Sequence, residues 1–376
     1  MFLEFAWNAW EKRKLGDLGT VAMNKRIYKD QTSDEGEIPF YKIGSFGKQA
    51  DAFISRKLFN EYKKLYPFPK KGDILISASG SIGRTIVYNG EDAYFQDSNI
   101  IWIQHDNRLD NTFLHQLFNI IRWSGVEGTT IKRLYNKNIL STQILLPSVE
   151  EQRSIGNLLD NVDNLIAATQ HKIDALEQAK KVLLQRLFDQ SWRFKDYSDP
   201  WEKRKFKNLV VRVNKTSDNS TIPSVEFEDI ISKQGRLNKD VRLKVNSKQG
   251  IYFEPQDVLF GKLRPYLQNW LFPSFYGRAV GDFWVLRANS SLLSEYLFVL
   301  IQSPRFQSVA NISSGTKMPR SDWNTVSNTS FSIPVQSEQR RIEQLFNVLD
   351  DLIAATQSRL SSLELLKKFL LQNLFI

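Results

Sequence analysis

The sequence contains no cysteine, only three histidines and only three methionines among its 376 residues. The absence of cysteine excludes disulfide bonds, thiolate zinc sites and a cysteine nucleophile, and it is consistent with a cytoplasmic protein. The chain also lacks an apolar run of about 18 residues, so we expect no membrane-spanning helix. Its first residues, MFLEFAWNAWEKRK, show no basic start followed by an apolar run, which argues against a secretory signal peptide.

Motifs that would mark a nucleotide or metal site are missing as well. There is no GxxxxGK[ST] loop for a phosphate group, and the glycines of SASGSIGR (77–84) do not form a dinucleotide fingerprint. The histidines, His105, His115 and His171, are scattered rather than grouped with carboxylates. We therefore predict no metal site in this chain.

What the chain does contain is a long repeated segment. Residues 151–188 and 338–375 align without a gap and are identical at 21 of 38 positions. Both copies begin with EQR, share LIAATQ in the middle and end in LLQxLF. A repeat of this density indicates two copies of one structural unit.

The repeated unit is larger than this segment. WEKRK occurs at Trp10 and again at Trp201, and each copy precedes a segment rich in short strand patterns. In the first segment the β-branched and aromatic runs are 38–44, 73–79, 85–89 and 98–104, followed by helical spacing over 109–123 and a last strand that ends at Pro147. The second segment repeats this order, with 257–261 matching 73–79 and a helix expected over 292–302.

The apolar residues of the repeats follow alternating steps of three and four. In the second copy these are Ile342, Leu345, Leu349, Leu352, Thr356, Leu363, Leu366 and Leu370. Such a pattern predicts a helix that pairs with another helix along a coiled-coil seam. A helix of this length would extend about 57 Å, too long to fit inside one small domain.

We therefore predict an α+β chain with an internal pseudo-two-fold repeat, in which two long antiparallel coiled-coil helices separate two α/β lobes. The expected boundaries are 1–147 for the first lobe, 148–189 for the first long helix, 190–335 for the second lobe and 336–376 for the second long helix.

Charge is distributed unevenly along this plan. The chain has a net charge of +10 and a pI of about 9.4. Each repeat helix carries five Lys or Arg and five Asp or Glu, so the surplus lies in the lobes. Basic lobes favour an acidic polymer as partner, with a membrane surface as the alternative. Neutral helices with more apolar positions than a two-helix seam uses indicate a docking surface for protein.

This combination resembles the specificity (S) subunit of a type I restriction–modification enzyme. The resemblance extends over the whole chain and rests on the WEKRK segments, the GDILIS and QDVLF strands, the LPxxxEQR-type junctions and the LIAAT…LLQxLF helices. A departure is the short segment before Trp10, which leaves little room for ordered structure ahead of the first lobe.

The resemblance implies that each lobe is a target recognition domain that reads one half of a bipartite, asymmetric site in double-stranded DNA. It implies that the helices set the gap and that two methyltransferase (M) subunits dock on the chain. These would methylate adenine N6 with S-adenosylmethionine, and restriction (R) subunits could join the complex. The chain itself would hold no cofactor and would not catalyse.

The residues agree with a non-catalytic chain. An adenine methyltransferase would show an Asn/Asp-Pro-Pro-Tyr/Phe motif, and the nearest match, Asp199-Pro200-Trp201, has a single proline at a domain junction. An X-Pro pair there indicates a plain turn.

Candidate DNA-contacting residues lie in two pairs of basic loops. One pair is SASGSIGR and its counterpart GKLRPY, and the other is GTTIKRLYNK and GTKMPR. Arg or Lys in these loops could bind phosphates, and Arg could also bind guanine edges; a hairpin turn or a solvated charged loop is the alternative for each. The candidates are Arg84, Lys132, Arg133, Lys137, Lys262, Arg264, Lys317 and Arg320. For WEKRK, packing of Trp10 and Trp201 is favoured over DNA contact.

Candidate residues for the partner-helix interface come from the apolar positions of the two long helices. They are Leu158, Leu165, Ile166, Leu176, Leu183, Leu345, Leu352, Ile353, Leu363 and Leu370. A competing hypothesis is a stand-alone, homodimeric DNA-binding or architectural protein whose helices pair with a second copy of the chain. Co-purification with two methyltransferase subunits would distinguish the two.

Overall fold

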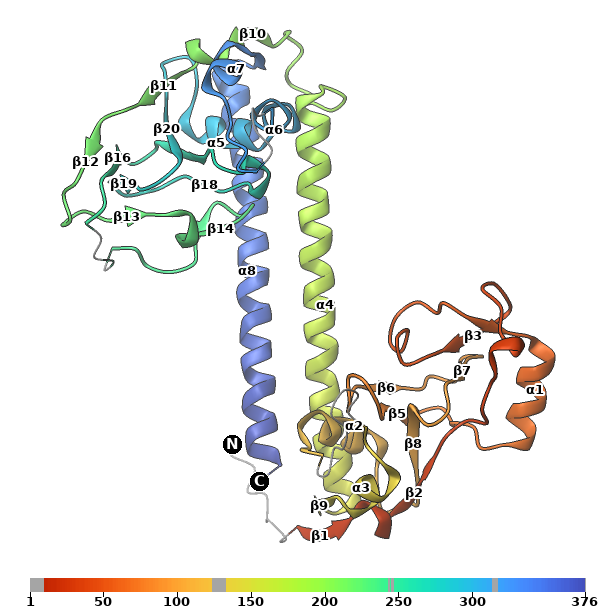
Figure 1. Ribbon diagram of the computed structural model, residues 1–376. Coiled ribbons are helices and arrows are strands. Elements are labelled where there is room, and N and C mark those ends of the chain that lie inside the picture. The colour runs from red at the N-terminus through yellow and green to blue at the C-terminus, as the bar shows by residue number, and fades with distance from the viewer. Residues whose placement is uncertain (1–9, 124–132, 243, 245–246, 313–316, 376) are drawn as a thin grey trace. The chain divides into compact units, whose positions relative to one another are not determined.

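A computed structural model describes residues 10–123, 133–242, 244, 247–312 and 317–375 (Figure 1). The chain divides into two compact units: the first comprises 1–168 and 360–376, and the second comprises 169–359. Among the described residues, none of the helices is both long and apolar enough to cross a membrane.

The first unit contains the first lobe, the N-terminal half of the long helix α4 and the last turns of the long helix α8. Its strands are β1 (Glu11–Lys14), β2 (Gly19–Ala22), β3 (Ile38–Tyr41), β4 (Phe53–Ile54), β5 (Ile74–Ser77), β6 (Thr85–Val87), β7 (Tyr94–Phe95), β8 (Ile100–His105) and β9 (Gln143–Leu146). Its helices are α1 (Arg56–Leu65), α2 (Asn111–Ile120), α3 (Asn136–Ser141) and the corresponding part of α4 (Val149–Phe188).

The first lobe is built on a four-stranded sheet of order β2-β8-β5-β6, in which every pair is antiparallel. A three-stranded sheet, β4-β3-β7, and the β1–β9 ribbon complete it. The core on the helix side of the sheet includes Ile76, Ile101 and Phe113, all at most 1% exposed. Ile155 and Leu159 of α4 belong to the same core, so this end of α4 is part of the lobe.

The second unit contains the second lobe, the C-terminal half of α4 and most of α8 (Gln336–Leu374). Its strands are β10 (Glu202–Lys205), β11 (Val210–Val213), β12 (Thr216–Ser217), β13 (Ser224–Val225), β14 (Ile230–Ile231), β15 (Arg236–Leu237), β16 (Gly250–Phe253), β17 (Val258–Gly261), β18 (Trp270–Leu271), β19 (Gly277–Ala279), β20 (Phe283–Ala288) and β21 (Ser330–Ile333). Its other helices are α5 (Ser294–Gln302), α6 (Pro304–Ala310) and α7 (Trp323–Asn328).

The second lobe repeats the sheet of the first. Its antiparallel order β11-β20-β17-β18 corresponds strand by strand to β2-β8-β5-β6, and the β10–β21 ribbon corresponds to β1–β9. A second four-stranded sheet, β12-β16-β19-β13, replaces the three-stranded sheet of the first lobe. The predicted α+β repeat is confirmed, and the lobes diverge mainly outside the shared sheet.

The long helices pack through a stripe of buried residues. On α4 the buried positions are Gln152, Ile155, Gly156, Leu159, Val162, Thr169, Ile173, Leu184 and Leu187. Within the second unit Lys180 near the end of α4 pairs with Asp350, whereas Arg193, just beyond that end, pairs with Glu338 at the start of α8. The two helices therefore run antiparallel there, as predicted.

The buried stripe of α8 includes Ile342 and Thr356 of the predicted seam, but Phe346 and Ile353 are buried in place of their neighbours Leu345 and Leu352. Phe346 and Ile353 are 1% and 7% exposed, whereas the adjacent seam candidate Leu352 is 40% exposed. Ile342 and Phe346 belong to the core of the second lobe. Packing of the lobe on α8 therefore shifts the buried face of this helix slightly from the predicted seam.

One predicted loop is partly helical. The segment around Lys137 was expected to be a loop, but α3 begins at Asn136, so Lys137 lies in its first turn. Ile139, which is fully buried in the core of the first lobe, anchors this short helix. The second lobe has α7 in the corresponding place, after Pro319 and Arg320.

Candidate functional site

Each lobe is joined to the long helix that follows it by the same polar junction. Trp10 Nε1 donates to Glu151 Oε1 at 3.1 Å in the first unit, and Trp201 Nε1 donates to Glu338 Oε2 at 3.1 Å in the second. The WEKRK tryptophans thus pack at the EQR ends of the long helices, as the sequence predicted.

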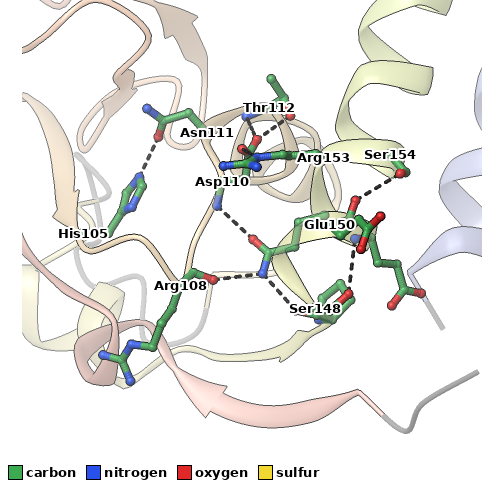
Figure 2. A network of polar contacts seen from close by, with 12 residues as sticks. His105, Arg108, Asp110, Asn111, Thr112, Ser148, Glu150, Arg153 and Ser154 are labelled. Carbon is green, nitrogen blue, oxygen red and sulfur yellow. Dashed lines mark hydrogen bonds and ion pairs between the residues drawn. The ribbon is translucent and has the colours of Figure 1, made fainter.

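The glutamine of EQR closes the junction. Gln152 Nε2 donates to the carbonyl oxygens of Pro147 and Arg108, and its Oε1 accepts from the Asp110 amide, each at 2.9 Å (Figure 2). Gln339 makes the same three contacts with Pro334, Ser291 and Leu293. Because both glutamines are buried, each fixes the start of a long helix to the loop before α2 or α5.

A carboxylate belongs to the first junction. Asp110 is the N-cap of α2, accepts from the backbone and side chain of Thr112 and pairs with Arg153 (Figure 2). Partial burial of Asp110 opposes its ionisation, but the bonds from Thr112 and Arg153 outweigh burial and lower its pKa below 3.8.

We predict that Asp110 makes the stability of the first unit acid-sensitive. A lowered pKa in the folded state stabilises the fold above the unfolded pKa, near 3.8, and this contribution is lost as pH falls through the folded pKa. Urea unfolding measured from about pH 5 to pH 2 should therefore show a flatter pH dependence for Asp110→Asn than for the unsubstituted chain. Parallel curves for the two proteins would contradict the assignment.

A second polar contact ties the long helices together within each unit. Lys180 Nζ lies 2.6 Å from Asp350 Oδ1 and donates to Gln302 of α5 at 2.8 Å. Lys367 Nζ lies 2.5 Å from Asp163 Oδ1, which shares its carboxylate with Gln116 of α2. These lysines and aspartates occupy matching positions of the two repeats. These ion pairs were not predicted from the sequence, because the prediction considered only apolar positions. The identity of these lysines and aspartates in both repeats was the sequence signal that could have revealed them.

The predicted basic loops come together in the second lobe. Leu263 and Arg320 form a β-bridge, and the Arg264 amide donates to the Pro319 carbonyl at 2.7 Å. Lys262 and Arg320 both contact Asp282, at 3.4 and 3.0 Å. We call Lys262, Arg264, Lys317, Arg320 and Asp282 the second-lobe loop site.

Asp282 holds the charge of this site together. Burial of its carboxylate opposes ionisation, but the hydrogen bond and charge of Arg320, with the charge of Lys262, outweigh burial and lower the pKa of Asp282. The sequence did not identify Asp282 as part of this site, because Asp282 lies outside the two basic loops. It is in the turn immediately before β20.

Arg264 stands apart from that carboxylate. Its side chain is exposed, and its backbone is left-handed, with φ of 47°. Gln268, four residues on, is also left-handed, and Tyr266 between them is 54% exposed. Positive φ is uncommon for residues other than glycine and is concentrated at functional sites. The turn therefore displays an arginine and a tyrosine side chain at the surface.

The first lobe has a corresponding arrangement, in which the uncharged Asn99 takes the central position. We call Ser79, Asn99, Arg133 and Leu134 the first-lobe loop site. Ser79 and Arg133 form the matching β-bridge, and Leu134 donates to the Ala78 carbonyl. Asn99 accepts from Ser79 at 2.7 Å and from Arg133 at 3.4 Å, in the place that Asp282 occupies in the second lobe.

The remaining basic candidates of the first lobe differ in exposure. Arg84 is half-buried, with its guanidinium over the Phe46 ring at 5.6 Å and a bond to the Ile43 carbonyl. Lys137 is exposed on α3, over the Tyr135 ring. Lys132 lies outside the described residues. Arg133 and Lys137 are thus the exposed members of this set.

The interface candidates also divide by exposure. Leu158 and Leu165 are each 45% exposed, and Leu352 is 40% exposed. Those that are half-buried are Ile166, Leu176, Leu183, Leu345, Leu363 and Leu370. Ile353 is buried.

Residues 8–178 match the family model of the type I restriction modification DNA specificity domain. This match covers a little under half of the chain, and by it the chain is similar to type I restriction–modification specificity subunits. Specificity subunits are the non-catalytic, DNA-recognising members of type I restriction–modification complexes.

Two relatives show how far the similarity extends. A Haemophilus influenzae protein named as a type I restriction enzyme specificity subunit is 51% identical over 170 residues, which cover 45% of this chain. The aligned segment spans only 44% of that relative. The MjaVIII specificity subunit of Methanocaldococcus jannaschii is 23% identical over 337 residues, 82% of this chain and 76% of its own length.

Solved structures share the fold of this chain. The type I S subunit from M. genitalium superposes with a TM-score of 0.65 at 14% identity, covering 100% of this chain and 98% of its own. A chain from a study of type I complex assembly and conformational transition superposes with a TM-score of 0.53 at 14% identity, covering 98% and 97%.

Proposed function

We propose that this chain is the DNA sequence-recognition subunit of a type I restriction–modification complex. Each lobe reads one half of a bipartite, asymmetric DNA site, and the long helices set the gap between the half-sites. The helices also dock two methyltransferase subunits, which methylate adenine N6 with S-adenosylmethionine, and restriction subunits join through that complex. The chain binds no cofactor itself and acts in the cytoplasm, where the DNA is.

The observation that carries this proposal is the contrast between what the two repeats keep and what they change. The Trp–Glu–Gln junction and the Lys–Asp contact are the same in both units. The loop sites share a backbone bridge but have Asn99 in one lobe and Asp282 in the other. A common scaffold with different polar surfaces suits two lobes that read different sequences.

The experiment that tests the proposal is genome-wide mapping of methylated adenines with and without this gene. We expect one bipartite motif with two different halves to disappear from the deletion strain. Purification provides a second readout, because the chain should hold two methyltransferase subunits. A soluble homodimer that binds DNA without them would instead support a stand-alone DNA-binding protein.

The gap between half-sites provides a separate prediction. Removing one heptad from each helix, near residues 165–171 and 359–365, shortens each by about 10 Å, which corresponds to about three base pairs. The methylated motif should keep both half-sites and lose about three base pairs of gap. Half-sites that change identity at a constant gap would contradict the role of the helices in spacing.

The loop sites supply the contacts with DNA in this proposal. Arginines at exposed turns can bind phosphates and can also read base edges. The residues proposed to contact DNA are the eight basic residues named from the sequence, including Lys132. Arg264→Ala should weaken binding of the complex by about 1–3 kcal/mol and relax the sequence preference at one position. Equal affinity at fixed salt would contradict base reading by Arg264. Arg242→Ala, an exposed arginine beside Asp240, is the matched control.

A further inference from the structure

The tryptophan of each WEKRK motif packs at a junction between lobe and helix, but the four residues after it have no part in that contact. Residues 11–14 form β1 and residues 202–205 form β10, and both strands have the sequence EKRK. Apart from Arg204, which is half-buried, all of these side chains are exposed. Exposed side chains change at little energetic cost, so their identity in the two repeats indicates a function beyond packing.

Side chains on a strand alternate between two faces, and the first face of each EKRK strand is neutral. It carries the glutamate and the arginine, which pair with each other at 2.7 Å in both copies. The arginines stand opposite Ile144 of β9 and Phe331 of β21, and both of these residues belong to lobe cores. This face therefore points toward the lobe.

The other face of each strand carries only lysine. We call its four residues the ribbon lysines: Lys12, Lys14, Lys203 and Lys205. Within the described part of the chain, none of them forms an ion pair. Lys14 stands opposite the exposed Gln143, and the two lysines of β10 stand opposite Ser332 and Ser330. The outward face is thus a pair of uncompensated cations beside polar side chains.

Protection of a strand edge accounts for only part of this pattern. β1 and β10 each pair with one other strand, and charged side chains at an open edge prevent pairing with a second chain. The glutamate and the arginine of each motif already supply charge at that edge. Edge protection therefore gives no reason for two further lysines on the outward face of both copies.

The outward face of β10 borders a hollow of about 520 Å³. Its polar lining includes two cations, Lys203 and Arg305, the hydroxyls of two serines and one carboxylate, that of Asp189. Lysine, arginine and serine side chains are among the groups that proteins use to bind phosphate oxygens of DNA. The surroundings of the second ribbon therefore suit a phosphate.

Each pair of ribbon lysines lies near the loop site of its own unit. The chain advances ten residues from Arg133 to Gln143, and ten from Arg320 to Ser330. Six of the residues on each path form a short helix, α3 or α7, so the path spans at most about 23 Å. One turn of duplex DNA is longer, about 34 Å. A duplex held at a loop site can therefore also reach the ribbon.

We propose that the ribbon lysines bind phosphates of the duplex beside each half-site, without reading its sequence. The bases of the two half-sites differ, whereas the phosphate backbone is the same at both, so identical lysines suit the backbone. Lysine is depleted in protein–protein interfaces, which favours DNA over a protein surface as the partner. The inference rests on the proposed function, because it takes the DNA bound at the loop sites as that partner.

The test uses the complex of this chain with its methyltransferase subunits and a fluorescent duplex that carries the methylated motif. Anisotropy titrations from about 50 to about 200 mM salt measure how steeply affinity falls with salt. Lys12→Gln combined with Lys14→Gln removes two phosphate contacts, so this variant should lose about tenfold less affinity over that range than the unsubstituted complex. Lys203→Gln combined with Lys205→Gln should behave in the same way. On duplexes trimmed to the two half-sites, the variants and the unsubstituted complex should have equal salt dependence.

Glu11→Gln combined with Arg13→Gln is the matched control, because it alters the other face of the same strand at constant net charge. It should keep the full salt dependence, and all variants should methylate the same motif with the same gap. An unchanged salt dependence in both lysine variants would overturn the inference and leave the proposed function intact. Loss of a methyltransferase copy from these variants in native mass spectrometry would also overturn it, by assigning the lysines to a protein contact. An unsubstituted complex without sequence-dependent binding would overturn the proposed function itself.

Discussion

Arg193→Met is expected to destabilise the second unit by about 3–5 kcal/mol. Arg193 forms two parallel bonds of 2.7 Å with Glu338, whose side chain is fully buried. Removing the guanidinium leaves a buried carboxylate whose remaining side-chain hydrogen-bond partner among the described residues is the Trp201 indole, and an uncompensated buried charge is strongly unfavourable. The hydrogen bonds that Arg193 donates to Glu338 also raise the pKa of Arg193, so the guanidinium stays charged.

Urea unfolding followed by tryptophan fluorescence measures this change. The matched control is Arg341→Met, because Arg341 pairs with Asp196 at 3.4 Å with both side chains exposed, and surface pairs contribute about 0–1 kcal/mol. Glu338→Gln should lie between the two, since an amide still accepts from Trp201 and Arg193 retains some contact with water. Equal effects of Arg193→Met and Arg341→Met would show that Glu338 finds another partner.

Gly156→Ala is expected to destabilise the first unit by about 1–3 kcal/mol, although alanine is the better helix former. A Cβ at Gly156 would lie 2.2 Å from Thr112 Oγ1 and 2.6 Å from the Phe113 amide nitrogen. The second contact is with backbone, so a rotation of the Thr112 side chain cannot relieve it. The added methyl must instead push α2 away from α4 and disturb the core formed by Phe113 and Ile155.

Two substitutions control for this effect. Gly44→Ala adds the same methyl where there is no atom within 4 Å among the described neighbours, and it should be close to neutral. Glu343→Ala probes the matching position of α8, where burial and then the charge of Glu295 raise the pKa of Glu343, so loss of that carboxylate should be tolerated. If Gly156→Ala has the same urea midpoint of unfolding as the unsubstituted chain, α2 and α4 do not approach as closely as described.

Most of the scaffold follows from local pattern in the sequence. The strand runs around Ile76 and Ile101 and the helix around Phe113 carry their own signals, and each recurs in the second repeat. The paired long helices follow from the three-and-four spacing. These features are determined by residues close together in the sequence, and a periodic pattern of apolar residues indicates such local structure.

The predictions that missed depend on distant contacts. The exposure of the seam candidate Leu352 is set by the second lobe, which packs on another face of α8 through Ile342 and Phe346. Asp282 reaches Arg320 from 38 residues away, so neither basic loop reveals its partner. The exposure of Arg264 comes from left-handed backbone that no sequence pattern predicted. The roles of the eight basic residues stay predictions.

The C-terminal turns of α8 also determine when the first unit can finish folding. Leu370, Leu371, Leu374 and Phe375 pack against the core that Phe113 and Leu159 help to form, and the Phe375 ring stacks on Phe113 at 5.2 Å. During synthesis the ribosome completes the first lobe roughly 200 residues, or about 10–40 s, before these side chains exist. Until then the first core exposes an apolar surface to chaperones, proteases and other nascent chains. Premature termination near residue 360 would thus damage the half of the protein that was made first.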